Sequence, residues 1–253
     1  MKSILAFETS EEAVKYENIT KELMAKLKSY QQILEQNFEL ATIPKGVLWT
    51  KGELATTTFS TIPIPAFTRE DFIYMSPILK EWQNLLVSQL DGKVMPHIQS
   101  FYENFSNDQL FVILAHELTH HIDLFVDEFE DDRHDSIWFE EGMCFYLPRK
   151  YCLTEEQFEE ITAIELELVN IFTEDYGEND LDDFGSMSYQ GSLSSIMFDY
   201  WRSYLKVKLL VEKMNGDIPS VFKLYKEWHK EGRETSLVQY FEDILKKSEE
   251  VLL

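Results

Sequence analysis

Apolar residues recur every three or four positions along most of this chain, a spacing that predicts amphipathic α-helices. The first predicted helix is long and highly charged, and it covers Ser10 to about Leu40. Two later helices begin with capping-box patterns, Ser106 with Gln109 and Thr154 with Gln157, and the second runs to about Asp175. The other predicted helices cover Ser76 to Gly92, Met95 to Phe105, Ile137 to Leu147 before Pro148, Ser188 to Asn215, Ile218 to Lys230 and Ser236 to Leu252.

The pattern changes between Ile43 and Met75, where Thr, Ile, Val, Phe and Pro dominate and short strands are predicted. The predicted strands cover Val47–Thr50, Thr56–Ile62 and Asp71–Met75, with an edge or irregular stretch at Pro63 and Pro65. We therefore predict an α+β protein, mostly helical, with a small N-terminal mixed or antiparallel sheet. Its predicted parts are an N-terminal helix (1–42) and a single domain (43–253), which divides into a β-containing part (43–75) and a helical part (76–253).

The chain has 253 residues and a formal net charge of −23 at pH 7. This charge would repel nucleic-acid phosphates and anionic membrane surfaces, and no basic patch offsets it. The apolar run within Met1–Phe7 is too short for a signal peptide, and no run is long enough to span a membrane. Cys144 and Cys152 lack the C-x-x-C spacing of a zinc site. We expect a cytoplasmic protein with reduced thiols and with no nucleic-acid or membrane partner.

The segment His116-Glu117-Leu118-Thr119-His120 is an H-E-x-x-H run inside a predicted helix. Residues turn by about 100° each in an α-helix, so the two imidazoles point about 40° apart and can bind one metal ion. Glu117 falls on the same side of the helix, as a general base for zinc-activated water requires. The opposite side carries an apolar stripe that would bury the helix in a core: Phe111, Leu114, Leu118, Ile122 and Phe125. The combination predicts a zinc hydrolase, and an ordinary amphipathic helix with two polar-face histidines is the alternative.

A catalytic zinc ion usually takes three protein ligands, so the two histidines need a partner. The acidic pair in Trp138-Phe139-Glu140-Glu141-Gly142 is the candidate. Neighbouring side chains on a helix diverge by about 100°, so only one of Glu140 and Glu141 can point at the metal. Helical periodicity leaves the choice between them open.

These two motifs together resemble the gluzincins, the zinc peptidases that include thermolysin and aminopeptidase N. In the aminopeptidase branch, a glutamate in a Trp-x-x-Glu-Gly context on a later helix completes the zinc site, and Trp138, Glu141 and Gly142 match that context. The resemblance therefore implies a thermolysin-like zincin catalytic domain in which Glu141 is the third zinc ligand. It covers about residues 45 to 245, and only its metal motifs are specific.

The segment Ser188-Tyr189-Gln190-Gly191 is similar to one in peptidase-MA-like domains, where a tyrosine hydroxyl faces the metal and helps to bind the oxyanion. The resemblance implies this role for Tyr189, and a tyrosine that packs at a helix start is the alternative.

One piece of the aminopeptidase pattern is missing. No Gly-x-Met-Glu-Asn segment, which recognises a free amino terminus, occurs between Trp49 and Ser106. Aminopeptidase activity is therefore not implied.

Other polar groups receive simpler interpretations. His97, His134 and His229 lack metal-ligand spacing. His121 lies about 100° around the helix from His120 and is expected to be solvated or to support a ligand rather than to bind the metal. The acidic stretches Asp127–Asp135 and Glu174–Asp183 do not match a calcium loop. Solvated charge runs are the simpler interpretation of both, with calcium binding as the alternative.

The sequence thus predicts a zinc-dependent hydrolase of the gluzincin type that cleaves peptide or protein substrates. His116, His120 and Glu141 would hold Zn, Glu117 would act as the base and Tyr189 would stabilise the oxyanion. The strands before Met75 would offer an edge to which an extended peptide can pair. The alternative is a zinc-stabilised binding or regulatory module with weak catalysis, for which the missing amino-terminus segment is an argument.

Overall fold

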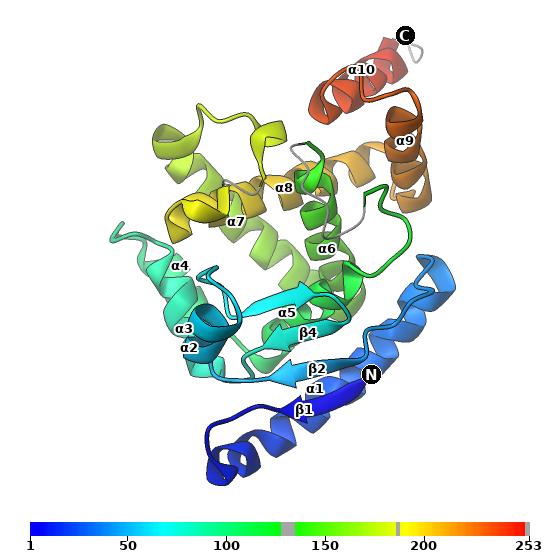
Figure 1. Ribbon diagram of the computed structural model, residues 1–253. Helices are drawn as coiled ribbons and strands as arrows, with labels where there is room; N and C mark the ends of the chain where they lie inside the picture. Colours follow the sequence, from blue (N-terminus) through cyan, green and yellow to red (C-terminus); the bar gives the residue numbers. More distant parts are fainter. Residues whose placement is uncertain (128–134, 186–187, 251–253) are drawn as a thin grey trace.

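Four short strands form one mixed sheet near the N-terminus (Figure 1). The computed structural model describes residues 1–127, 135–185 and 188–250. The strands are β1 (Lys2–Leu5), β2 (Gly46–Trp49), β3 (Ala66–Arg69) and β4 (Phe72–Met75), in the order β1-β2-β4-β3. β1, β2 and β4 run parallel, and β3 pairs antiparallel with β4 and forms one edge of the sheet.

Helices make up most of the remaining described chain, so the predicted α+β class and the mixed sheet are confirmed. The helices are α1 (Ser10–Asn37), α2 (Gly52–Leu54), α3 (Leu79–Ser88), α4 (Pro96–Glu103), α5 (Asn107–Thr119), α6 (Ile137–Cys152), α7 (Glu155–Tyr176), α8 (Leu193–Lys213), α9 (Ile218–Lys230) and α10 (Leu237–Glu250). Both predicted capping boxes are present, at Ser106 and at Thr154. Within the part of the chain that is described, no helix is both long enough and apolar enough to cross a membrane.

Helix α1 links β1 to β2, as the crossover of a parallel pair requires, and it packs against β1 and α5. Helix α5 in turn contacts β3 and β4, so it runs along the sheet close to its free edge (Figure 1). On its other side α5 packs against α6, and α6 packs against α8. α5 is therefore held between the sheet and the C-terminal helices.

One predicted strand is wrong, and one observed strand was not predicted. Thr56–Ile62 is not a strand, because Ala55–Phe59 forms a π-helical turn that continues α2. The hydroxyls of Thr56 and Thr57 donate to the carbonyls of Gly52 and Glu53, at 2.9 and 2.6 Å, and these bonds offset the β preference of threonine. The strand β1 was not predicted, since its pairing with β2 depends on a contact 44 residues away, Lys2 with Gly46.

Several helix boundaries also differ from those predicted. α3 covers Leu79–Ser88, and its N-cap is Ile78 rather than Ser76. Pro148 does not end α6, which continues to Cys152 although proline removes one helical hydrogen bond. The last turn is retained because Arg149 is buried and binds Glu165 of α7. At α8 the predicted start at Ser188 is too early. Ser192 caps the helix by accepting a hydrogen bond from the Ser195 amide, and Ser188–Gln190 forms a separate 3₁₀ turn.

Trp138 and Gly142, which belong to the Trp-x-x-Glu-Gly motif on α6, contribute to the packing of this helix. Trp138 is fully buried, and its Nε1 donates to Asp182 at 2.8 Å. Gly142 lies against α8, where an added Cβ would come within 2.5 Å of the Ser203 carbonyl oxygen and 2.6 Å of Val207 Cγ2. Glycine at this position lets α6 approach α8 closely. The motif therefore fixes the helix on which Glu140 and Glu141 lie.

Gly142→Ala is expected to destabilise the metal-free protein by about 1–3 kcal/mol or more, because the added methyl overpacks a backbone contact. The free energy of unfolding, measured by denaturant titration, tests this. Met143→Leu at the next buried position conserves volume and is the control, with an expected loss below about 1.5 kcal/mol. Equal stability of the wild type and Gly142→Ala would contradict the close approach of α6 to α8.

Candidate metal centre

Helix α5 presents the H-E-x-x-H residues from a buried position. Its capping box fixes the start of the helix at Ser106, and the predicted apolar face is buried at Phe111, Leu114 and Leu118. His116 and His120 are 6% and 8% exposed. His120 follows the last residue of α5 but keeps right-handed helical dihedral angles, so the two imidazoles still lie one turn apart.

The side chain of Glu141 reaches the two histidines from α6. His116 Nε2 lies 3.2 Å from His120 Nε2 and 3.2 Å from Glu141 Oε2. The third edge, from His120 Nε2 to Glu141 Oε2, is 3.7 Å. Tetrahedral zinc with bonds near 2.1 Å sets its ligand atoms roughly 3.4 Å apart. The three atoms therefore have the spacing that a single zinc ion requires.

One detail of this group favours a metal ion over a hydrogen-bonded cluster. Glu141 Oε2 is buried and has no hydrogen-bond partner among the described residues. Burial raises the pKa of the Glu141 carboxyl, but the charge of His120 and the contacts with His116 and Tyr189 outweigh it and lower the pKa, so the carboxylate is ionised at neutral pH. An ionised carboxylate and two imidazole nitrogens form the donor set of many catalytic zinc sites. Within the described residues, His116, His120 and Glu141 are the group that can hold a metal ion.

Glu140 points to the other nitrogen of His120. Its Oε1 lies 2.7 Å from Nδ1 of the imidazole, and both side chains are buried. A carboxylate that accepts a hydrogen bond from Nδ1–H fixes the orientation of the ring and directs Nε2 towards a bound metal ion. Helical periodicity left the choice of ligand between Glu140 and Glu141 open, and the resemblance implied Glu141. In the structure Glu141 lies at Nε2 of both histidines and Glu140 at Nδ1 of His120.

Glu117 lies beside the candidate ligands His116, His120 and Glu141, and a residue of the edge strand β3 binds its carboxylate. The hydroxyl of Thr68 in β3 is 3.0 Å from Glu117 Oε2 and 3.1 Å from the Glu117 carbonyl oxygen. Burial raises the pKa of the Glu117 carboxyl, against the opposing effect of the two histidines and Thr68. The sequence did not indicate Thr68, because its contact with α5 spans 49 residues.

The hydroxyl of Tyr189 donates to Glu141 Oε1 at 2.9 Å. Tyr189 therefore lies at the centre, where its contact is with a ligand carboxylate, and its role toward an oxyanion stays a prediction. Tyr200 of α8 donates to the Tyr189 hydroxyl at 3.3 Å and lines the same cleft. The sequence pattern did not single out Tyr200, one of several aromatic residues on its helix.

The centre opens into a cleft of about 230 Å³, lined by β3, α5, α6 and both tyrosines. On the side of His116 and Glu117 a second, more apolar cavity of about 100 Å³ extends between α4, α5, α6 and α8. A ligand in the cleft can therefore contact both Glu117 and the three candidate metal ligands. Arg69 of β3 also lines the cleft and places a positive charge there.

The other histidines do not join the centre. Burial and the neighbouring His120 lower the pKa of His121 to about 4. His97 pairs with Glu167 on the surface, and His229 contacts Arg233. His134 and most of the acidic Asp127–Asp135 stretch, for which calcium binding was left open, lie outside the described residues. Cys144 and Cys152 are both free thiols on α6.

Comparisons of the chain with models of known families, with curated proteins and with solved structures find no match. The chemistry of the centre therefore has to be argued from its own side chains.

Proposed function

We propose that this protein is a zinc-dependent hydrolase of the gluzincin type that cleaves peptide bonds. The observation that carries the proposal is the set of spacings between His116, His120 and Glu141, which match the edges of a zinc coordination tetrahedron. Three protein ligands leave one coordination position open, the arrangement of catalytic rather than structural zinc. Glu117 at the same centre supports a catalytic role, because a structural metal site has no use for a base.

Zinc bound here would supply an acidified water and polarise the substrate carbonyl. Glu117 would take a proton from the attacking water and later deliver it to the leaving amine. Thr68 would hold the Glu117 carboxylate in place for both transfers. Tyr189, with Tyr200 behind it, would donate a hydrogen bond as negative charge develops on the carbonyl oxygen.

A peptide is the substrate that the edge of the sheet favours. β3 lines the cleft, and its side away from β4 lies at the sheet edge. An extended peptide can pair with such an edge, which would align its backbone across the metal centre. The net charge of −23 argues against nucleic-acid and anionic membrane partners.

Hydrolysis of a mixed peptide library tests the proposal. We expect cleavage by the zinc-loaded protein, loss of cleavage after the metal is removed by a chelator, and recovery when one equivalent of zinc is added. Mass spectrometry of the products would identify the cleaved bonds. Cleavage at the same rate by the metal-free protein would contradict a zinc-dependent mechanism.

The second candidate is a zinc-stabilised binding or regulatory module with weak catalysis. The contact of the Tyr189 hydroxyl with Glu141 favours it, because a hydroxyl held by a ligand carboxylate has to be redirected before it can serve an oxyanion. One zinc ion per chain with no cleavage across the library would support this candidate.

A further inference from the structure

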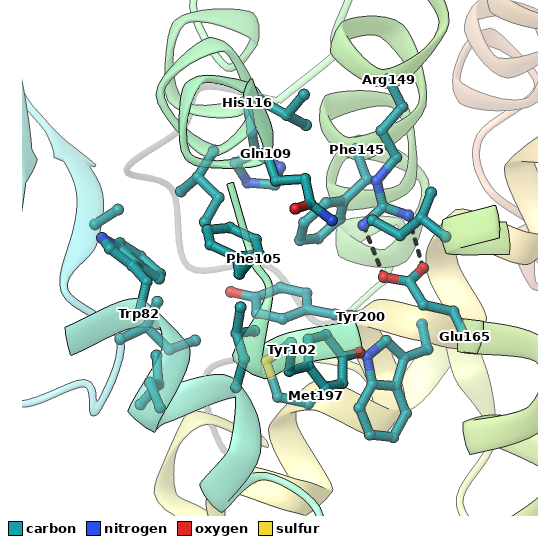
Figure 2. A pocket seen from close by; sticks show the side chains of 18 of the residues that line it. Trp82, Tyr102, Phe105, Gln109, His116, Phe145, Arg149, Glu165, Met197 and Tyr200 are labelled. Carbon is teal, nitrogen blue, oxygen red and sulfur yellow. Dashed lines mark hydrogen bonds and ion pairs between the residues drawn. The ribbon is translucent and has the colours of Figure 1, made fainter. Parts of the chain in front are cut away.

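The cavity beside the metal centre is mostly apolar, with a few polar groups in its lining. His116 and Glu117 line it, together with aliphatic and aromatic side chains from α3, α4, α5, α6, α7 and α8. Figure 2 shows Trp82 and Phe105 on one side of this space and the paired Arg149 and Glu165 on the other. A group bound in the cavity would therefore have both Glu117 and the Arg149–Glu165 ion pair in its lining.

The size of the cavity fits one side chain. Its volume of about 100 Å³ is smaller than the roughly 150 Å³ cavity that takes up benzene, so it admits no more than one tightly packed ring. The ring of Phe145 contacts both polar groups, with its centroid 4.2 Å from that of His116 and 4.8 Å from the Arg149 guanidinium carbon. One aromatic ring thus contacts both the metal-ligand candidate and the ion pair.

Two buried donors that line the cavity have no hydrogen-bond acceptor within the described part of the chain. Arg149 is 4% exposed and forms two hydrogen bonds with Glu165, at 2.6 and 2.8 Å. Its Nε, and Nε1 of the fully buried Trp201, have no partner among the described residues, and both side chains line the cavity. Buried donors without partners are costly, so they favour a ligand that brings an acceptor.

We infer that this cavity binds a tyrosine side chain of the substrate next to the bond to be cleaved. The inference rests on the proposed function for the reaction, but the cavity itself can be tested without it. The apolar walls accept the ring, and the phenol oxygen can accept from Arg149 Nε or Trp201 Nε1 while its hydroxyl donates to Glu165. A substrate side chain with a charged end is disfavoured in this cavity, because Glu165 already neutralises the charge of Arg149.

Binding of small probes to the metal-free protein tests the cavity independently of catalysis. p-Cresol has the side-chain structure of tyrosine, and toluene is the same molecule without the hydroxyl. We expect p-cresol to shift the methyl NMR signal of Met197, a lining residue, and to bind about tenfold or more tightly than toluene. Equal affinities, or no binding of either probe, would overturn the inference.

Two variants test whether p-cresol and toluene bind in this cavity. Met197→Trp fills the space and is expected to abolish binding of both probes. In the double variant Arg149→Met with Glu165→Leu, both partners are replaced by apolar groups, so no charge is left buried alone. It is expected to lose the preference for p-cresol over toluene. The control is the surface pair Lys206→Met with Glu242→Leu, which should bind both probes as the wild type does.

Peptide cleavage then separates this inference from the proposed function. In a series of peptides that differ at one position, Ala, Leu, Phe or Tyr, we expect the highest kcat/KM with Tyr. Cleavage without any preference for Tyr would overturn the inference and leave the proposed function standing. Selective p-cresol binding without cleavage of any peptide would keep the binding site and contradict the peptidase.

Discussion

Glu117→Gln is expected to lower kcat/KM for peptide hydrolysis by about 10²–10⁴-fold while zinc stays bound. Glutamine conserves the size of the side chain and can still contact Thr68, but it cannot accept a proton from the attacking water. It is also not one of the three candidate ligands, so the zinc affinity should change little. The measurements are initial rates with a cleaved peptide and the zinc content per chain.

The matched control is Asp108→Asn, which removes a carboxylate from the exposed first turn of the same helix. It should hydrolyse the peptide at the wild-type rate. Near-wild-type activity of Glu117→Gln would exclude Glu117 as the base and, with it, the proposed mechanism.

Glu141→Gln and Glu140→Gln are expected to weaken zinc binding to different extents. Glu141→Gln replaces an anionic ligand by a neutral amide and should cause the larger loss. Glu140→Gln changes the partner of His120 Nδ1 and leaves the three candidate ligands in place, and such changes typically weaken metal binding by about 10–100-fold. Competition with a chromophoric chelator measures both affinities.

The comparison between these two glutamates is informative because they are neighbours with the same side chain and similar burial. General destabilisation of α6 would affect both variants alike. A larger loss of zinc affinity in Glu140→Gln than in Glu141→Gln would reverse the assignment of ligand and supporting residue.

The sequence predicted most of what local patterns determine. The capping boxes at Ser106 and Thr154 fixed two helix starts, and the i, i+4 spacing of His116 and His120 was sufficient to bring their nitrogens together. The acidic pair on α6 was identified as the source of the third candidate ligand because it follows Trp138 in a recognisable context. These features depend on residues within one helical turn of each other.

Features that depend on distant contacts were not predictable in the same way. The support of Glu117 by Thr68 and the pairing of β1 with β2 join parts of the chain that are far apart in sequence. The segment Ala55–Phe59 forms a helical turn although its β-branched residues favour a strand, because threonine hydroxyls donate hydrogen bonds to nearby backbone carbonyls. The buried ion pair of Arg149 and Glu165 could not be predicted, because it depends on how α6 and α7 pack together.

The central claim is that His116, His120 and Glu141 bind one zinc ion, and anomalous diffraction at the zinc edge from crystals of the zinc-loaded protein tests it most directly. We predict one strong peak per chain, within about 2.2 Å of Nε2 of both histidines and of a Glu141 carboxylate oxygen. A zinc-loaded crystal with no peak at this position, or with the peak bound by Glu140 in place of Glu141, would contradict the account.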